Sequence, residues 1–241
     1  MIEAYFSHLS ALLDRVLKTQ KESIKKASLL LEEALEASNT VFAFGTGHSH
    51  MLSEELFYRA GGLVKVYPIF DEPLMLHVSA SRSSEIERRE GYAAALLDKT
   101  PLKENDLIFI FSNSGRNAVP VEMALEAKKR GAKTVCITNL THSTASASRH
   151  SSGKKLYEIC DVVIDNCGCK GDAAMDIDGL KCGPTSPAVG AAILWAAVCE
   201  AVRSLKKRGS LCEVFLSSNL DGSDEVNQAY IDKYNPSIPM L

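Results

Sequence analysis

The 241-residue sequence has no uninterrupted apolar run of the length that spans a bilayer and no excess of positive charge. A transmembrane helix requires about 20 consecutive apolar residues. The N-terminal segment also lacks the basic region and unbroken apolar run of a secretory signal. The formal net charge is −3, whereas nucleic-acid binding depends on clustered Lys and Arg. We therefore expect a cytoplasmic protein with neither a membrane nor a nucleic-acid partner.

Disulfide and metal-site patterns are missing as well, although the chain has seven cysteines. The count is odd, and most cysteines lie in apolar segments such as "TVCIT", where reduced cysteine behaves as a small hydrophobic residue. The segment "CDVVIDNCGC" and Cys182 lack the C-x-x-C spacing that marks zinc sites. We expect free thiols, no metal and no cofactor.

The apolar residues that are present follow two alternating periods. In residues 1–38 they recur every three or four positions, which predicts one long helix or two in tandem. Beyond this region, short apolar runs alternate with helical segments, a pattern typical of a parallel sheet covered by helices on both faces. We predict strands at 41–44, 63–70, 106–114, 133–139 and 160–166, and helices at 53–62, 84–99, 118–132 and 186–209.

No repeat or flexible linker divides the chain. We assign residues 1–38 to an N-terminal helical extension and residues 39–241 to a single three-layer α/β/α domain with a five-stranded parallel sheet. Residues 139–158 are rich in hydroxyl groups and are predicted to form a surface excursion. The tail from Cys212 predicts an apolar piece, a turn and a short helix capped by Ser223 or Asp224.

The first candidate site is the loop "FGTGHSH" at residues 44–50, which follows a predicted strand. In open parallel sheets, ligands bind beyond the carboxyl ends of the strands. Glycines there let backbone N–H groups turn toward an anion, although a tight turn with Ser49 as N-cap explains the loop equally well. His48 is a candidate acid or base because histidine titrates near neutral pH. The candidate binding residues are Gly45, Thr46, Gly47 and Ser49.

A dinucleotide site is an alternative for this loop. The G-x-G-x-x-G fingerprint requires a third glycine where this chain has His50, which argues against it. Asp71, after the next predicted strand, keeps open the hypothesis of an NAD(P)-binding oxidoreductase.

The second candidate site is "IFIFSNSGRN" at residues 108–117, where a buried strand turns into small polar residues. A plain helix N-cap needs one short polar side chain, whereas this loop has three before its glycine. We therefore favour an anion-binding loop at the start of the next helix. Its candidate binding residues are Ser112, Asn113, Ser114, Gly115, Arg116 and Asn117.

The third candidate site is "CGPTSPAVGAA", in which Thr185 and Ser186 precede Pro187 at the start of a long predicted helix. Capping accounts for one hydroxyl, and a proline is common at the first helical position. Anion binding by both hydroxyls and simple capping remain equal alternatives.

These three loops together resemble the SIS (sugar isomerase) domain, a phosphosugar-binding family. The resemblance covers roughly residues 40–207, and the S-x-S-G pattern, here Ser112 to Gly115, is its specific part. The stretches "GHSH", "FYRAGG", "SRHSSGKKL" and "NLDGSDEVN" are most similar to a group of single-domain SIS proteins. That group is related to phosphoheptose isomerases and N-acetylmuramic acid 6-phosphate etherases.

The resemblance implies a flavodoxin-like sheet, a sugar phosphate bound by Ser112, Ser114 and neighbouring amides, and a homodimer or dimer of dimers whose sites a second subunit completes. "SEELFYR" resembles the segment of phosphoheptose isomerases that carries a catalytic glutamate, which corresponds here to Glu55. Those isomerases also place a histidine on the last long helix, and residues 187–207 contain none. This difference puts heptose isomerisation itself in doubt.

Three functions follow as hypotheses. The first is an isomerase or lyase that moves a proton beside the carbonyl of a phosphorylated sugar or amino sugar, with Glu55 and His48 as catalytic groups. The second is a non-catalytic phosphosugar sensor, and the third is the oxidoreductase named above. Arg149, His150 and Lys154 form a candidate lid that clamps a phosphate or carboxylate, with a solvated loop as the alternative.

Overall fold

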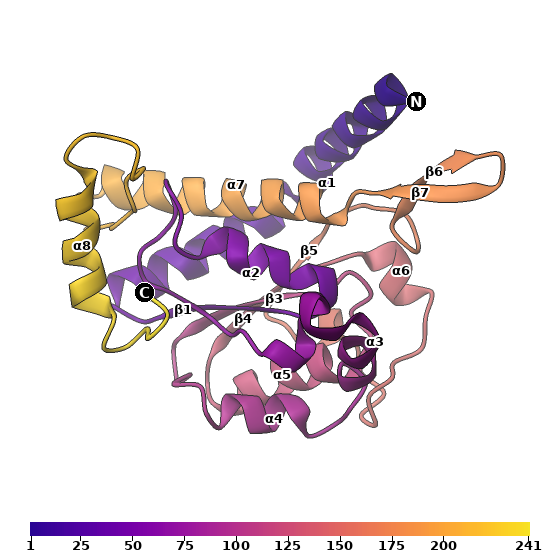
Figure 1. The fold of residues 1–241 in the computed structure, drawn as a ribbon, viewed down its shortest axis with the longest axis horizontal. Helices are drawn as coiled ribbons and strands as arrows, with labels where there is room; N and C mark the ends of the chain where they lie inside the picture. Colours follow the sequence, from indigo (N-terminus) through magenta and orange to yellow (C-terminus); the bar gives the residue numbers. More distant parts are fainter.

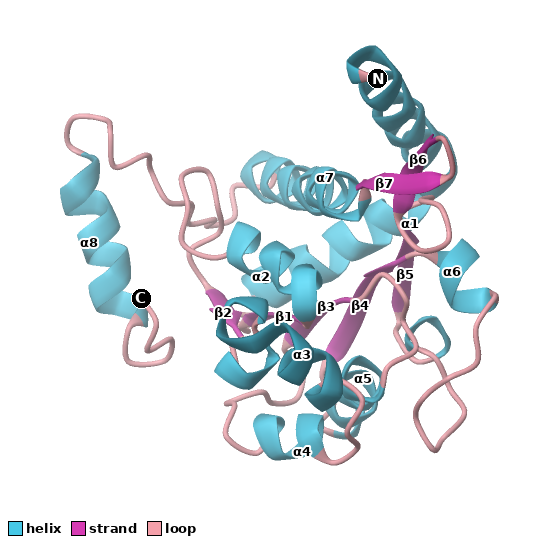
Figure 2. Ribbon diagram, turned by 45° about the vertical axis from the view of Figure 1, so that its right-hand side comes forward, coloured by secondary structure: helices cyan, strands magenta, loops and turns pink.

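The computed structural model describes residues 1–241 and contains a five-stranded parallel sheet in the order β2-β1-β3-β4-β5. Helices cover both faces of this sheet (Figure 1, Figure 2), so the predicted three-layer α/β/α class is confirmed. The strands are β1 (Val41–Gly45), β2 (Val66–Pro68), β3 (Leu107–Phe111), β4 (Lys133–Thr138) and β5 (Val162–Asp165).

The central strands β1 and β3 are buried along their whole length. Both are continuous apolar runs, as expected for parallel strands that have helices on each side. The chain leaves β1 for β2 on one side and returns to form β3 on the other, so the strand order reverses at this point. Loops that follow β1 and β3 therefore leave the sheet in opposite directions and open a crevice between them.

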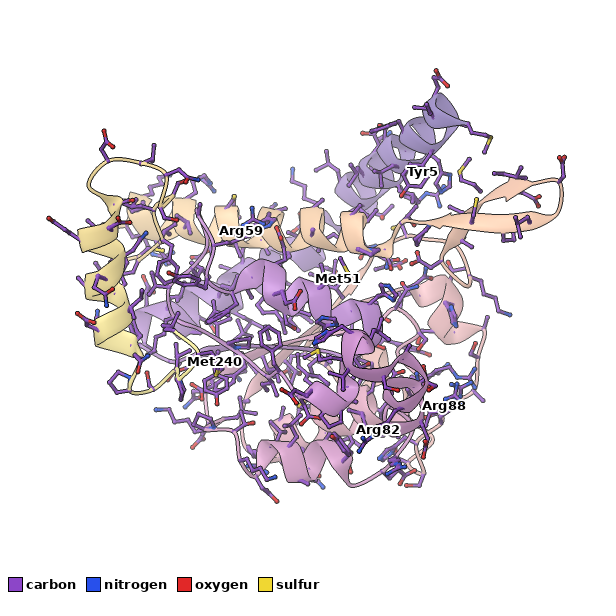
Figure 3. All side chains as sticks on the ribbon, in the orientation of Figure 1. Tyr5, Met51, Arg59, Arg82, Arg88 and Met240 are labelled. Atoms are coloured by element: carbon purple, nitrogen blue, oxygen red, sulfur yellow. The ribbon has the colours of Figure 1, made fainter.

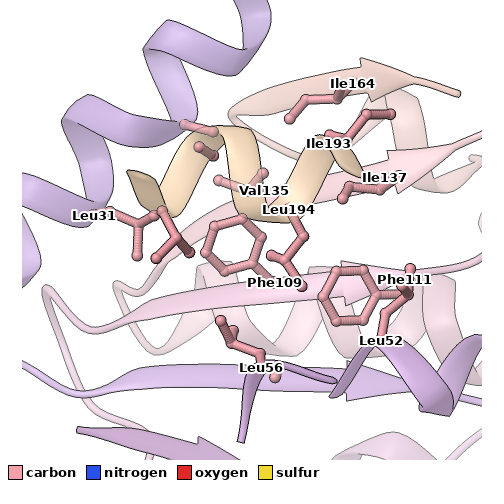
Figure 4. Packing of buried hydrophobic residues seen from close by; sticks show 14 of the residues in the cluster. Leu31, Leu52, Leu56, Phe109, Phe111, Val135, Ile137, Ile164, Ile193 and Leu194 are labelled. Carbon is pink, nitrogen blue, oxygen red and sulfur yellow. The ribbon is translucent and has the colours of Figure 1, made fainter. Parts of the chain in front are cut away.

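The helices form two layers with separate apolar cores. The sheet face that carries Phe109 and Phe111 packs against α1, α2 and α7, whereas the face that carries Ile108 and Ile110 packs against α3, α4 and α5. Figure 4 shows Leu31 of α1 and Leu194 of α7 meeting Phe109 in the first core. The helices are α1 (Ile2–Glu36), α2 (Met51–Leu56), α3 (Leu76–Ile86), α4 (Tyr92–Leu97), α5 (Ala118–Lys129), α6 (Leu140–Thr144), α7 (Ser186–Lys207) and α8 (Ser223–Tyr234), with short 3-10 turns η1 (Gly47–His50), η2 (Glu72–Leu74) and η3 (Leu156–Glu158).

Several predicted boundaries were wrong. The helix expected at 84–99 is interrupted between α3 and α4, because Gly91 adopts a φ of 80° and its N–H donates to the Glu122 carboxylate at 2.8 Å. The helix expected at 53–62 ends at Leu56, and β2 is shorter than 63–70. The tail helix begins at Ser223, but neither predicted side chain caps it, since Gly222 occupies the N-cap position.

A β-hairpin at residues 173–184 was not predicted. It consists of β6 (Ala173–Ile177) and β7 (Leu180–Pro184) and extends from the body of the protein near the N-terminal end of α1 (Figure 1). Asp178 and Gly179 between the strands both have positive φ. An Asp-Gly pair is a strong sequence signal for such a hairpin, so this element was recognisable.

Helix α7 is an exception to the expectation that no segment of the chain could span a membrane. By length and composition this 22-residue helix is apolar enough to cross a membrane. Its residues Ile193, Leu194 and Ala197 are buried in the first core. The apolar character of α7 is thus used in packing against the sheet and α1.

The packing of α1 gives the first prediction. Leu31 is fully buried in the first core, whereas Leu29, two residues earlier on the same helix, is 53% exposed. Leu31→Ala should lower the free energy of unfolding by about 2–5 kcal/mol, because it removes buried apolar atoms and leaves a cavity. Leu29→Ala is the matched control and should change it by less than about 0.5 kcal/mol. Urea unfolding measures both, and equal effects would mean that α1 does not pack as described.

Candidate functional site

The three predicted loops meet at one cleft above the carboxyl ends of β1, β3 and β4. Polar residues from each loop line it, and Leu52, Phe111 and Ile137 form its apolar part. The polar lining residues are His48, Ser49, Ser112, Asn113, Asn166 and Ser186, and Pro187 completes the lining. The cleft therefore joins segments that are more than 130 residues apart in the sequence.

The first loop is built around two glycines. A Cβ atom on Gly45 would lie 2.5 Å from the Ser49 carbonyl oxygen, so a larger residue does not fit there. Gly47 has a φ of 55° and opens the 3-10 turn that carries Ser49. The Thr46 hydroxyl donates to Glu87 Oε1 at 2.6 Å and is buried away from the cleft. Ser49 lines the cleft, is the N-cap of no helix, and its hydroxyl makes no hydrogen bond within the chain.

The two histidines of this loop have different surroundings. His48 is exposed at the cleft. His50 is buried, with Nδ1 on the Gly47 carbonyl and Nε2 3.3 Å from a carboxylate oxygen of Glu54. The His50 side chain therefore holds the turn together at the position where a dinucleotide fingerprint needs glycine.

The loop after β3 is held in place by its own polar groups. Ser112 Oγ accepts from the Gly115 N–H at 3.1 Å, and Gly115 has a φ of 58° that favours glycine. Asn113 Oδ1 accepts from Asn166 Nδ2 at 2.8 Å, which ties this loop to the end of β5. Ser112 and Asn113 line the cleft, whereas Ser114 and the three residues after it lie outside the lining.

Asn166 was not among the predicted site residues. It is buried, and its Oδ1 also accepts from the Gly168 N–H at 3.0 Å. The available signal was a polar residue at the end of the fifth predicted strand, because ligands bind at the carboxyl ends of parallel strands.

The third loop binds a carboxylate from another part of the chain, that of Asp172. Asp172 Oδ1 accepts from the N–H groups of Thr185 at 3.1 Å and of Ser186 at 2.9 Å, and its Oδ2 accepts from the Ser186 hydroxyl at 2.5 Å. Asp172 has a φ of 66°, unusual for a residue with a side chain. Its carboxylate occupies the N-terminus of α7, where negative charge is favourable. Thr185 is fully buried, and of the pair only Ser186 lines the cleft.

Glu55 lies outside the cleft lining. Its Oε1 accepts from Trp195 Nε1 at 2.6 Å and pairs with Arg59, whose guanidinium lies 5.4 Å from the centre of the Trp195 ring. Figure 3 labels Arg59 beside α7, beyond Met51 along the chain. Leu52, one helical turn before Glu55, is the α2 residue that lines the cleft. Glu55, the predicted catalytic base, is thus bound by Trp195 and Arg59 and lies about one helical turn from the cleft lining.

Asp71 and the cysteines are occupied in other ways. Asp71 Oδ2 accepts from the Tyr92 hydroxyl at 2.5 Å, and burial together with this carboxylate raises the pKa of Tyr92 to about 12. All seven cysteines are free thiols. The Asp71 carboxylate, on which the dinucleotide alternative depended, is therefore already bound by a side chain of the same protein.

Comparison with known proteins places the chain in a family. The SIS domain family profile matches residues 4–139, which contain most of α1 and the first four strands. A UPF0309 protein of Geobacillus thermodenitrificans is 46% identical over 243 residues, covering 100% of this chain and 98% of the relative. A UPF0309 protein of Listeria innocua is 40% identical with the same coverage.

Solved structures share the fold at low sequence identity. Phosphoheptose isomerase GmhA from Neisseria gonorrhoeae aligns with a TM-score of 0.54 and 14% identity, covering 82% of this chain and 95% of that one. The sugar isomerase domain of an RpiR transcription factor from Sphaerobacter thermophilus aligns with a TM-score of 0.52 and 16% identity, covering 98% of each chain. The Vibrio vulnificus NanR protein, solved with ManNAc-6P, aligns with a TM-score of 0.51 and 18% identity, covering 100% of this chain and 69% of NanR. From the matched profile and the full-length relatives, the chain belongs to the SIS domain family, within the group of UPF0309 proteins.

Proposed function

We propose that this protein binds a sugar phosphate in the cleft and acts on it as an isomerase or lyase. The observation that carries the proposal is the convergence of Ser49, Ser112 and Asn113 from two loops at the point where the strand order reverses. Family membership supports the phosphate as ligand. Among proteins of the same fold, one is a phosphoheptose isomerase and another was solved with ManNAc-6P.

The phosphate would lie against the loop after β3. The 12-residue helix α5 begins just beyond this loop, so the positive end of its dipole faces the site. The hydroxyls of Ser49 and Ser112 and the amide of Asn113 would supply side-chain donors. Ser186 could join them only by leaving Asp172, because its hydroxyl already donates there.

Proton transfer is assigned to His48 and Glu55. His48 is the only residue of the cleft lining that has an ionisable side chain. Glu55 would reach a substrate only if its carboxylate rotated away from Trp195 and Arg59. The shortage of titratable groups in the cleft favours the second candidate, a sensor that binds a sugar phosphate without converting it.

Phosphate binding is tested on Ser49. Its hydroxyl makes no contact that holds the loop, so Ser49→Ala removes a ligand donor without disturbing the turn. The dissociation constant for glucosamine 6-phosphate and N-acetylglucosamine 6-phosphate should rise about tenfold, since one hydrogen bond to a charged group is worth about 1.5–3 kcal/mol. Isothermal titration calorimetry measures it, and Ser84→Ala on the exposed face of α3 is the control. Equal affinity of all three proteins would remove Ser49 from the site.

Catalysis is tested by NMR in D₂O with a panel of hexose and N-acetylated amino-sugar phosphates. An isomerase or lyase should incorporate deuterium beside the substrate carbonyl or release a product. Glu55→Gln should abolish turnover while the affinity for the sugar phosphate changes less than threefold, because the amide cannot take a proton. Unchanged turnover in this variant would take Glu55 out of the mechanism. Stabilisation of the wild-type protein by a ligand that is never converted would favour the sensor.

We also propose that two copies associate through α1. Ile2, Phe6, Leu13 and Leu17 are exposed and follow helical spacing along one face. A face of this kind on a helix that already packs on its own domain fits a second copy of the chain. Light scattering after gel filtration should give at least twice the 26.2 kDa chain mass. Phe6→Glu with Leu17→Glu should yield monomers, whereas Lys18→Glu on the opposite face should not, and a monomeric wild-type protein would contradict the proposal.

A further inference from the structure

Three arginines lie near one another at the loop that follows β3. They are Arg88 from the turn after α3, Arg116 from the loop itself and Arg149 from the segment after α6, and we call them the arginine cluster. Arg88 lies on the side of the molecule where that segment passes (Figure 3). Arg59 and Arg130 pair with carboxylates elsewhere, but no residue of the cluster has a carboxylate oxygen within 4.0 Å.

The Arg116 side chain has no hydrogen-bond or ion-pair partner within the chain. Its side chain is half-buried, and its Nε is inaccessible to solvent and has no acceptor. An unpaired buried donor costs about 1–3 kcal/mol, and more when it is charged. The two terminal Nη atoms of Arg116 also have no partner within the chain, and they are not buried, so they can bind an anion from outside.

The segment after α6 holds Arg149 against Arg116. The Arg149 N–H donates to the Arg116 carbonyl at 2.8 Å, and Leu156 N–H donates to the Gly115 carbonyl at 2.9 Å. Arg149 Nη1 donates to Asn117 Oδ1 at 2.8 Å. Ser151 bonds to Glu90 through its N–H and its hydroxyl, each at 2.6 Å. Hydrogen bonds therefore hold the predicted surface excursion against the loop that follows β3, and they fix the position of Arg149.

The positive charges of the arginine cluster repel one another. Partial desolvation lowers the pKa of Arg149, and the charges of Arg116 and Arg88 lower it further, with Glu87 as the opposing negative charge. Glu87 already accepts from Thr46. On the other side of Arg116, burial and then the Arg116 charge lower the pKa of His142. A bound anion would relieve this repulsion.

We propose that the ligand carries a second anionic group, a carboxylate or a second phosphate, and that Arg116 and Arg149 bind it. The proposal rests on the proposed function, in which the loop residues before Gly115 hold the first phosphate. Two residues separate Asn113, which lines the cleft, from Arg116, so their Cα atoms lie within about 11 Å of each other, a span that a phosphorylated sugar and an arginine side chain bridge together. Guanidinium groups bind carboxylates and phosphates through paired hydrogen bonds, which suits either group.

Matched pairs of ligands test the second anion. Isothermal titration compares 6-phosphogluconate with glucitol 6-phosphate, which differ in one carboxylate, and fructose 1,6-bisphosphate with fructose 6-phosphate, which differ in one phosphate. The doubly anionic member of at least one pair should bind at least tenfold more tightly to the wild-type protein. The pair that shows the difference identifies the second group.

Variants assign the effect to the cluster. Arg149→Gln should reduce the preference for the doubly anionic ligand to less than threefold, whereas Arg82→Gln, an exposed arginine of α3 outside the cluster, should retain it. Equal affinities within both wild-type pairs would overturn the inference, and this comparison needs no variant to fold. If single phosphates bind and Ser49→Ala weakens them while the second anion adds nothing, the proposed function stands and the arginine inference falls. If no sugar phosphate binds, both fall.

Discussion

The pairing of β1 with β3 is the constraint on which the site depends. The two strands run in register from Val41 opposite Leu107 to Gly45 opposite Phe111, so the chain leaves both strands at the same level of the sheet. The glycine-containing loop after Gly45 and the hydroxyl-containing loop after Phe111 then begin side by side. Since β2 lies on the other side of β1, the loops diverge and leave a crevice between them. Apolar side chains on both faces of these strands hold this geometry.

The two helix N-termini beside this crevice differ in whether a carboxylate of the chain is bound there. At the start of α7 the chain provides its own carboxylate, because Asp172 accepts from Thr185 and Ser186. At the start of α5 no acidic side chain plays this part, and Arg116 stands without an acceptor. At the start of α5, therefore, the ligand phosphate we propose would not have to displace a carboxylate of the chain. Entry of a ligand phosphate at α7 would require competition with a carboxylate that is already well bound.

The chemistry inside the cleft is limited by the few groups that can move a proton. His48 is exposed and lines the cleft, whereas Glu55 is engaged by Trp195 and Arg59 one helical turn away. The two candidate functions, an isomerase or lyase and a sensor, would use the same phosphate-binding residues. In the isomerase or lyase we propose, the Glu55 carboxylate would in addition have to leave Trp195 and Arg59.

The sequence by itself determined the strand and helix alternation and the position of the polar loops, because hydrophobic periods and turn residues act over a few neighbouring positions. It also identified Ser112 to Gly115 and the 44–50 loop as ligand-binding candidates. It missed Asp172, Asn166 and the break at Gly91, and it left open whether Arg149 lies in a solvated loop. Only the tertiary structure decided these points, since Asn113 meets Asn166, Glu55 meets Trp195 and Arg149 meets Asn117 across long stretches of chain. Contacts of this kind arise from how the packed layers bring strand ends together, and no local pattern encodes them.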